Sequence, residues 1–260
     1  ADFAVAPDTL ALCRQLVDSG EVDALVAERV WQELSRGLME DAPARMLTVL
    51  RDAGALAKIL PEVDALWGVP QPAAHHPEID CGAHLLLVVE MAARLHGSLP
   101  ARFAALTHDL GKATTPAAEW PRHLGHEQRS VALLAPLCER LRVPNDCKGV
   151  AQVVAREHGH LHRSGEFGAQ ALVRLLERCD ALRKPQRFDE ILLACEADAR
   201  GRAGFADAPY PQAQRLRTAL AAAQSIDAGA IAAAHAGAEI PAAIPAARVA
   251  AVSAQLGIPA

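Results

Sequence analysis

Apolar residues recur at three- and four-residue spacing through almost all of this 260-residue chain, and that period constrains its fold most. Residues 27–40 ("AERVWQELSRGLME") and 44–60 ("ARMLTVLRDAGALAKIL") show it clearly. Residues 83–97 ("AHLLLVVEMAARLHG") are too apolar on every side for a surface helix. No strand pair stands out, and aromatic residues make up only 3% of the chain, so the core should be helix packed on helix. The pattern predicts an all-α fold.

Composition narrows the class of protein. A hydrophobic content of 51% with 22% charged residues is globular rather than disordered. The net charge of −5 excludes a generally basic nucleic-acid binder but allows a local basic patch. No apolar run reaches the roughly 18 residues of a membrane span, and no signal peptide is visible. None of the six cysteines forms a C-x-x-C pair, which predicts buried thiols in a cytoplasmic protein.

The most informative segment is "RFAALTHDLGKATTP" at residues 102–116, where an apolar run leads directly into His108 and Asp109. A buried imidazole beside a buried carboxylate carries a large desolvation cost unless the two are paired or bind a metal. Lys112 follows one helical turn after His108, where its ammonium group could hold a phosphate. These residue types predict a metal site.

Most of the eleven histidines lie between residues 75 and 162, which concentrates the chemistry in the middle of the chain. Helices packed in a bundle can direct such residues at one interior point, and imidazole with carboxylate suits Zn, Mn, Fe, Co or Ni. The candidate ligands from the separate helical stretches are His84, His108, Asp109, His126, His158 and a later aspartate, either Asp180 or Asp198.

Each candidate also has a simpler interpretation. His84 could be a hydrogen-bonded core histidine, His126 could cap a helix, and Asp180 and Asp198 could pair with Arg183 and Arg202. His160 and His162 could belong to a solvated loop or line the mouth of a pocket. The remaining histidines are expected in loops or on the surface: His75, His76, His96, His123 and His235.

His84, then His108-Asp109 followed by Leu-Gly-Lys, then a distant aspartate, resembles the HD-domain superfamily of metal-dependent phosphohydrolases. The similarity extends further. Several segments resemble the C-terminal part of a bacterial HD-domain CCA-adding enzyme, a tRNA nucleotidyltransferase: "AERVWQEL", "LPEVDALWGVPQP", "HHPEIDCGAH", "RKPQRFDEILLACEADARGR" and "YPQ". The resemblance implies three parts: a helical neck and body at 1–74, the HD domain at 75–185 and a helical tail at 186–260.

The chain departs from that family in one respect. The family's polymerising head has a Gly-Ser turn followed by Asp-x-Asp, and "HGSLP" has only the Gly-Ser. The family's nucleotide-selecting Glu-Asp-x-x-Arg is missing too, because "EDAPAR" at 40–45 has one residue too many and is expected to be a loop between helices. The chain is therefore expected to lack the head and to add no nucleotide by itself.

The resemblance implies a divalent metal, Ni²⁺ or Mn²⁺ or another transition metal, with Mg²⁺ for nucleotidyl transfer by the parent enzyme. By this resemblance Asp180 is the first choice as last ligand, and Asp198 is the alternative. His126 and His158 would bind a second ion or the phosphate. His108, Asp109 and Lys112 are the implied catalytic residues.

The implied activities are 2′,3′-cyclic phosphodiesterase, 2′-nucleotidase and phosphatase, on nucleotides or tRNA ends, and a homodimer is left open. The alternative is a tRNA-binding scaffold with a vestigial metal site. The basic residues that could contact phosphates are Arg183, Lys184, Arg187 and Arg202.

Overall fold

The computed structural model describes residues 4–235 and 237–259, and within them the fold is all-α. Helices follow one another along the described chain, and the single β-type contact there is an isolated antiparallel bridge between Pro70 and Asp80. The predicted fold class is confirmed. No helix of the described part is both long and apolar enough to cross a membrane.

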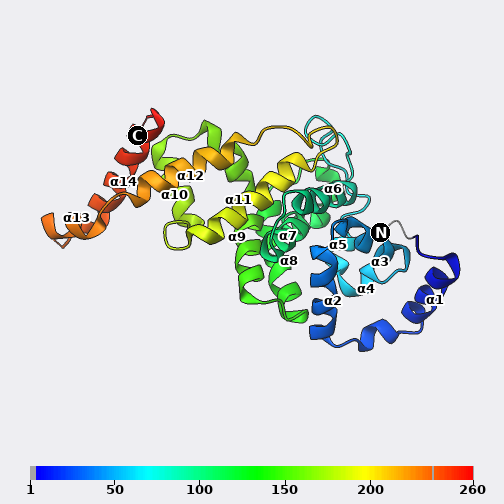
Figure 1. The fold of residues 1–260 in the computed structure, drawn as a ribbon. Coiled ribbons are helices and arrows are strands. Elements are labelled where there is room, and N and C mark those ends of the chain that lie inside the picture. The colour runs from blue at the N-terminus through cyan, green and yellow to red at the C-terminus, as the bar shows by residue number, and fades with distance from the viewer. Residues whose placement is uncertain (1–3, 236, 260) are drawn as a thin grey trace.

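The N-terminal part is a set of short helices at one end of the molecule, drawn in blue in Figure 1. Proline at the first helical position starts three of them, because its missing N–H is not needed in the first turn. Pro43 is one of these, so "EDAPAR" is only partly the expected loop: its last residues open a helix. The helices are α1 (Pro7–Asp18), α2 (Ala27–Met39), α3 (Pro43–Asp52), α4 (Leu56–Ile59) and α5 (Pro61–Asp64), with a 3-10 turn η1 (Glu21–Ala24) after α1.

The middle of the molecule is built around one buried helix, α7 (Leu99–Thr107). Its residues 101–107 are all buried, and it packs on α6, α9 and α11. Asp80 and Ser98 cap α6 and α7 by accepting hydrogen bonds from the first-turn N–H groups. The surrounding helices are α6 (Cys81–Arg94), α8 (His126–Arg140), α9 (Asn145–His162), α10 (Ala169–Arg178) and α11 (Pro185–Arg200), with 3-10 turns η2 (Leu110–Thr114), η3 (Ala117–Glu119) and η4 (Arg163–Glu166).

The C-terminal part extends away from the middle on the side opposite α1 (Figure 1). It consists of α12 (Pro211–Gln224), α13 (Ala228–Ala234) and α14 (Ile240–Leu256). Helix α14 packs on α12 and α10 through residues such as Val252, which is fully buried. All six cysteines are free, and five of them are buried, as predicted.

Candidate metal centre

The His108-Asp109 pair lies where a buried helix ends. Helix α7 closes at His108, and the backbone then turns at Asp109 into η2. This turn packs closely on the start of α8: an added Cβ on Gly111 would lie 2.1 Å from the His126 carbonyl oxygen. The Gly111 N–H donates to Ser130 Oγ at 2.8 Å. The glycine thus allows the backbone approach that brings His126 towards Asp109.

A first group of side chains meets at His108 Nε2. Its Nε2 lies 3.2 Å from Asp109 Oδ2 and 3.6 Å from Asp198 Oδ1. His84, from α6, places its Nε2 3.0 Å from the same Asp198 oxygen. All four side chains are buried, and together they present imidazole nitrogen and carboxylate oxygen from three helices and one turn.

A second group shares Asp109 with the first. Asp109 Oδ1 lies 3.3 Å from His126 Nε2 and 3.5 Å from His158 Nε2. The two imidazole nitrogens are 3.2 Å apart. Ligand atoms of His84, His108 and Asp109 lie close enough together to hold one ion, as do those of Asp109, His126 and His158, so Asp109 is common to two candidate positions. His84 also forms a third such set, with His76 and Glu78.

The backbone fixes which ring nitrogen faces the centre. The Nδ1–H groups of His108, His126 and His158 donate to carbonyl oxygens of nearby residues, at 2.8, 2.8 and 3.0 Å. In neutral histidine this assigns the hydrogen to Nδ1 and leaves the Nε2 lone pair free. The Nε2 atoms of all three rings therefore face Asp109, where their lone pairs are available to a cation.

Two buried atoms at the centre, His108 Nε2 and Asp109 Oδ1, have no hydrogen-bond partner. The atoms around them are close enough for contact but do not have the orientation that a hydrogen bond requires. A spherical cation does not require that orientation. Nitrogen and oxygen donors of this kind suit a divalent transition metal, so the residues present fit such an ion.

The charges around the centre compete. Burial opposes protonation of His108, but Asp109 and Asp198 outweigh it and raise its pKa to about 10. Burial likewise opposes ionisation of Asp109, yet Lys112 and His108 hold its pKa well below the usual range. The carboxylates stay ionised at neutral pH, and without a metal the histidine next to them attracts a proton.

Lys112 is buried at the edge of the centre. Its Nζ donates to Asp109 Oδ2 at 2.6 Å and to Gln71 Oε1 at 2.8 Å. An ammonium group has three N–H donors, so one remains for a phosphate oxygen.

Glu78 and His162 were not predicted as ligands, but each contacts a side chain that was. Glu78 Oε1 lies 2.8 Å from His84 Nδ1, while Asp198 lies at the other nitrogen of the same imidazole ring. His162 Nε2 lies 2.7 Å from Asp198 Oδ2, and His162 Nδ1 lies 3.1 Å from the Tyr210 hydroxyl. Carboxylate partners behind ligating histidines, and hydrogen bonds to ligating carboxylates, typically orient metal ligands.

The structure places Asp180, the first choice for the last ligand, away from the centre and Asp198, the alternative, beside His84 and His108. Asp180 lies two residues after α10, has a positive φ of 55° and faces Arg183, Lys184 and Arg187 at 3.0, 3.9 and 3.2 Å. That carboxylate is satisfied by cations on the surface. Helix α11 instead carries Asp198 inward, where it is buried.

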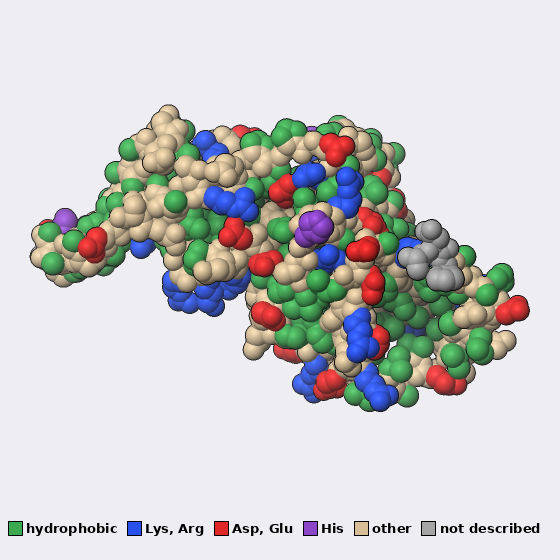
Figure 2. Space-filling view, in the orientation of Figure 1, with side chains coloured by type: hydrophobic (Ala, Val, Ile, Leu, Met, Phe, Trp, Pro, Cys, Tyr) green, Lys and Arg blue, Asp and Glu red, His purple; other side chains and the backbone are tan. Residues whose placement is uncertain are grey.

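The predicted phosphate-contact residues divide between two places. Arg183 and Lys184 belong to the loop between α10 and α11, and Arg187 belongs to the first turn of α11; Lys and Arg gather at this edge of the molecule in Figure 2. Arg202 instead lines the hollow beside the metal centre.

Two of the histidines expected on the surface lie inside. His123 is buried, with its ring between Thr115 Oγ1 and the Pro70 carbonyl, both at 2.9 Å. His76 is half-buried, 3.2 Å from Glu78. The other three, and also His160, are exposed: His75, His96 and His235.

A hollow of about 430 Å³ opens beside the centre and reaches Lys112 and His126. Cationic side chains at its wall include Arg122 and Arg202. A small anion such as a phosphate ester can therefore approach the centre through positively charged surroundings.

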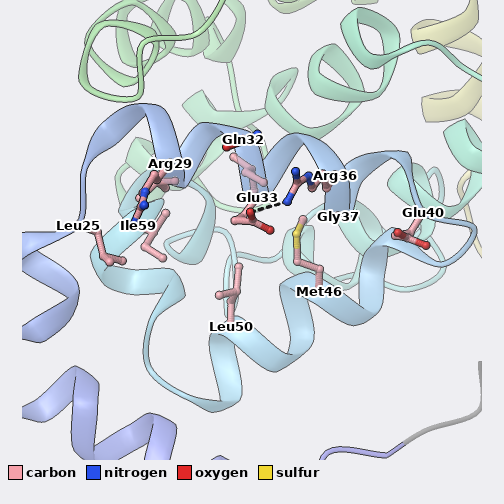
Figure 3. Close-up of a pocket in the computed structure, with 12 residues that line it drawn as sticks. Leu25, Arg29, Gln32, Glu33, Arg36, Gly37, Glu40, Met46, Leu50 and Ile59 are labelled. Carbon is pink, nitrogen blue, oxygen red and sulfur yellow. Dashed lines mark hydrogen bonds and ion pairs between the residues drawn. The ribbon is translucent and has the colours of Figure 1, made fainter.

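A larger hollow of about 840 Å³ lies elsewhere, between α2 and α3 (Figure 3). Leu25, Met46, Leu50 and Ile59 line it, and Arg36 pairs with Glu33 across its edge. No histidine or cysteine lines this hollow, so its size does not make it the chemical site.

Comparison with known proteins agrees with the site. Residues 82–202 match the model of the HD domain, a range that contains both groups of candidate ligands. Residues 2–66 match a family described as the probable RNA and SrmB-binding site of polymerase A. Residues 82–202, which hold the His-Asp centre, are thus similar to the HD domain.

Curated relatives make the assignment more specific. Over 232 residues, 89% of this chain, it is 72% identical to the Multifunctional CCA protein of Burkholderia multivorans, of which it covers 56%. The protein of the same name from Burkholderia mallei is 67% identical over 260 residues, 99% of this chain and 63% of that protein. The chain is a homologue of the C-terminal part of the Multifunctional CCA proteins, as the sequence predicted, and it spans about 56 to 63% of the length of these relatives.

Proposed function

We propose that this chain is a metal-dependent phosphohydrolase that acts on 2′,3′-cyclic phosphates and 2′-phosphates of ribonucleotides and RNA ends. The observation that carries the proposal is that the Nε2 atoms of His108, His126 and His158 face Asp109, with His108 Nε2 and Asp109 Oδ1 buried and without a hydrogen-bond partner. Ligands of the ion or ions would be His84, His108, Asp109 and Asp198, with His126 and His158 completing a second position around Asp109.

A divalent cation there would polarise a phosphoryl oxygen and activate water for attack. The chain's own residues have separate tasks. Asp109 belongs to both sets of candidate ligands, and because Lys112 and His108 hold its pKa well below the usual range, it would bind an ion rather than accept a proton. Lys112, with one free donor, would neutralise charge on the phosphate as it enters from the hollow.

The ligand geometry argues against a vestigial site. A site that had lost its ion would gain stability by replacing unpaired buried acceptors, because such groups are costly. The contact of His162 with Asp198, and of Tyr210 with His162, is the kind of support that orients a ligating carboxylate.

We also propose tRNA as the macromolecular partner. The match of residues 2–66 to an RNA-binding family and the name of the relatives support this. Arg183, Lys184 and Arg187 form a basic surface suited to phosphate contacts, although Asp180 offsets part of its charge.

The test is a metal analysis of the purified chain, followed by hydrolysis of 2′,3′-cyclic AMP with added Ni²⁺ or Mn²⁺. We expect at least one bound ion per chain and turnover that chelation abolishes. His108→Ala and Asp109→Ala should remove both, while circular dichroism shows that the helices persist. Full turnover in either variant would contradict the proposal.

A further inference from the structure

One exposed aromatic side chain lies beside the hollow that leads to the metal centre. Trp120 follows η3, and 36% of its surface is exposed. Its indole Nε1–H donates to the Thr115 carbonyl at 3.1 Å, which fixes one edge of the ring. Leu124, in the same loop, is 75% exposed. Exposed large apolar side chains close together commonly mark a binding surface.

The loop is tied to the same frame as the candidate ligands. Thr115 is buried, and its Oγ1 accepts from Arg129 at 2.7 Å and contacts His123 Nδ1 at 2.9 Å. The Arg129 Nε–H also donates to the Gly111 carbonyl at 3.0 Å, two residues after Asp109. These bonds hold Trp120 in a defined position relative to the turn that carries Asp109 and Lys112.

Two hollows meet at this loop. The hollow that reaches Lys112 is also lined by Arg122 and Leu124. A neighbouring hollow of about 380 Å³ shares these two residues and is lined in addition by Trp120, Glu119 and Ala118. The two hollows are therefore adjacent, with Arg122 and Leu124 in the wall that they share.

The hollows differ in charge. Lys112, Arg122 and Arg202 line the first together with one glutamate, Glu127, so its wall has a net positive charge that suits an anion. The second has one arginine and one glutamate and is otherwise apolar, so it suits an uncharged, flat group. A ribonucleotide has both parts: a phosphate and, about one ribose away, a base with a π-face.

We propose that Trp120 and Leu124 form a nucleobase subsite of the phosphohydrolase. The base of the substrate lies against the Trp120 ring while its phosphate lies beside Lys112. The position of the phosphate rests on the proposed function. Because every base has a π-face, the subsite selects nucleotides and RNA ends over base-free phosphoesters, with little preference among the four bases.

The kinetic test compares two substrates with the same five-membered cyclic phosphodiester: 2′,3′-cyclic AMP and ethylene phosphate, which has no base. Trp120→Ala should lower kcat/KM for cyclic AMP about 10-fold, mainly through KM, and leave ethylene phosphate unchanged. Trp120→Phe should retain most of the activity. Phe205→Ala is the matched control, because Phe205 is 43% exposed and lines neither hollow.

A binding measurement separates this subsite from the proposed function. By calorimetry, the unmodified chain should bind 2′-AMP about 10-fold more tightly than inorganic phosphate, and Trp120→Ala should remove the difference. Turnover of neither substrate would reject the phosphohydrolase, but the binding comparison would still decide the subsite. An equal loss with both substrates, or equal binding of 2′-AMP by the unmodified chain and Trp120→Ala, would overturn the inference.

Discussion

Metal binding should replace a proton on His108 with the metal ion, and this exchange determines how the free energy of unfolding depends on pH. In the metal-free chain the pKa of His108 is raised to about 10 because Asp109 and Asp198 outweigh its burial. Its unfolded value is about 6.5. A raised folded pKa contributes stability that is complete below the unfolded pKa and is lost as pH rises towards the folded pKa. The window of loss therefore begins near neutral pH.

The magnitude follows from one proton at about 1.4 kcal/mol per pH unit. From pH 7.0 to 8.5 the free energy of unfolding of the metal-free chain should fall by about 2 kcal/mol. The carboxylates do not titrate in this window, because both of their folded pKa values are lowered. Staying at or below pH 8.5 limits ionisation of the cysteine thiols, which the unfolded chain would expose.

The assay is urea unfolding at pH 7.0, 7.75 and 8.5, with a chelator and then with saturating Ni²⁺. The metal should abolish the loss, because it takes the position of the proton and its apparent affinity rises as pH rises. His108→Gln should remove most of the slope in the chelated chain. Stability that is flat or rising from pH 7.0 to 8.5 in the chelated, unmodified chain would refute the reasoning.

Three further outcomes are expected. Asp198→Asn should weaken Mn²⁺ binding at least ~10-fold by calorimetry, whereas Asp180→Asn should stay within about twofold; the reverse order would restore Asp180 as ligand. Gly111→Ala should cost about 2 kcal/mol or more in urea unfolding, because its Cβ would lie 2.1 Å from backbone oxygen, while Gly165→Ala, with open space, should cost little. The chain should not extend tRNA that lacks CCA when given CTP, ATP and Mg²⁺; any product above a no-protein control would reveal a further catalytic centre.

The helical fold was predictable because its signal is local. Apolar spacing, prolines at helix starts and the Asp80 and Ser98 caps each act within a few residues of sequence. The His108-Asp109 pair was equally visible, since an adjacent acid and imidazole after an apolar run have few structural explanations.

The remainder of the centre depends on packing over long sequence distances. Asp180 and Asp198 both lie at or near a helix end with an arginine nearby, and only the rotation and placement of α11 decide which of them turns inward. Glu78 and His162 were not assigned as supports, although "HHPE" places acid and imidazole together and "HGHLH" places His162 four residues after His158. Contact between His162 and Tyr210 joins residues 48 apart in the chain, which no local pattern encodes.

The long-range contacts also determine how much of the chain the centre requires. Asp198 belongs to α11, so a fragment that ended at residue 185 would lose one of the two carboxylates that face His108. Tyr210 lies one residue before α12, and the Gln212 side chain donates to the His162 carbonyl at 3.1 Å, so the first turn of α12 holds the end of α9. The start of the C-terminal part is thus attached to the metal centre through His162 and Asp198. A change that moves α12 should therefore disturb the contact between His162 and Asp198.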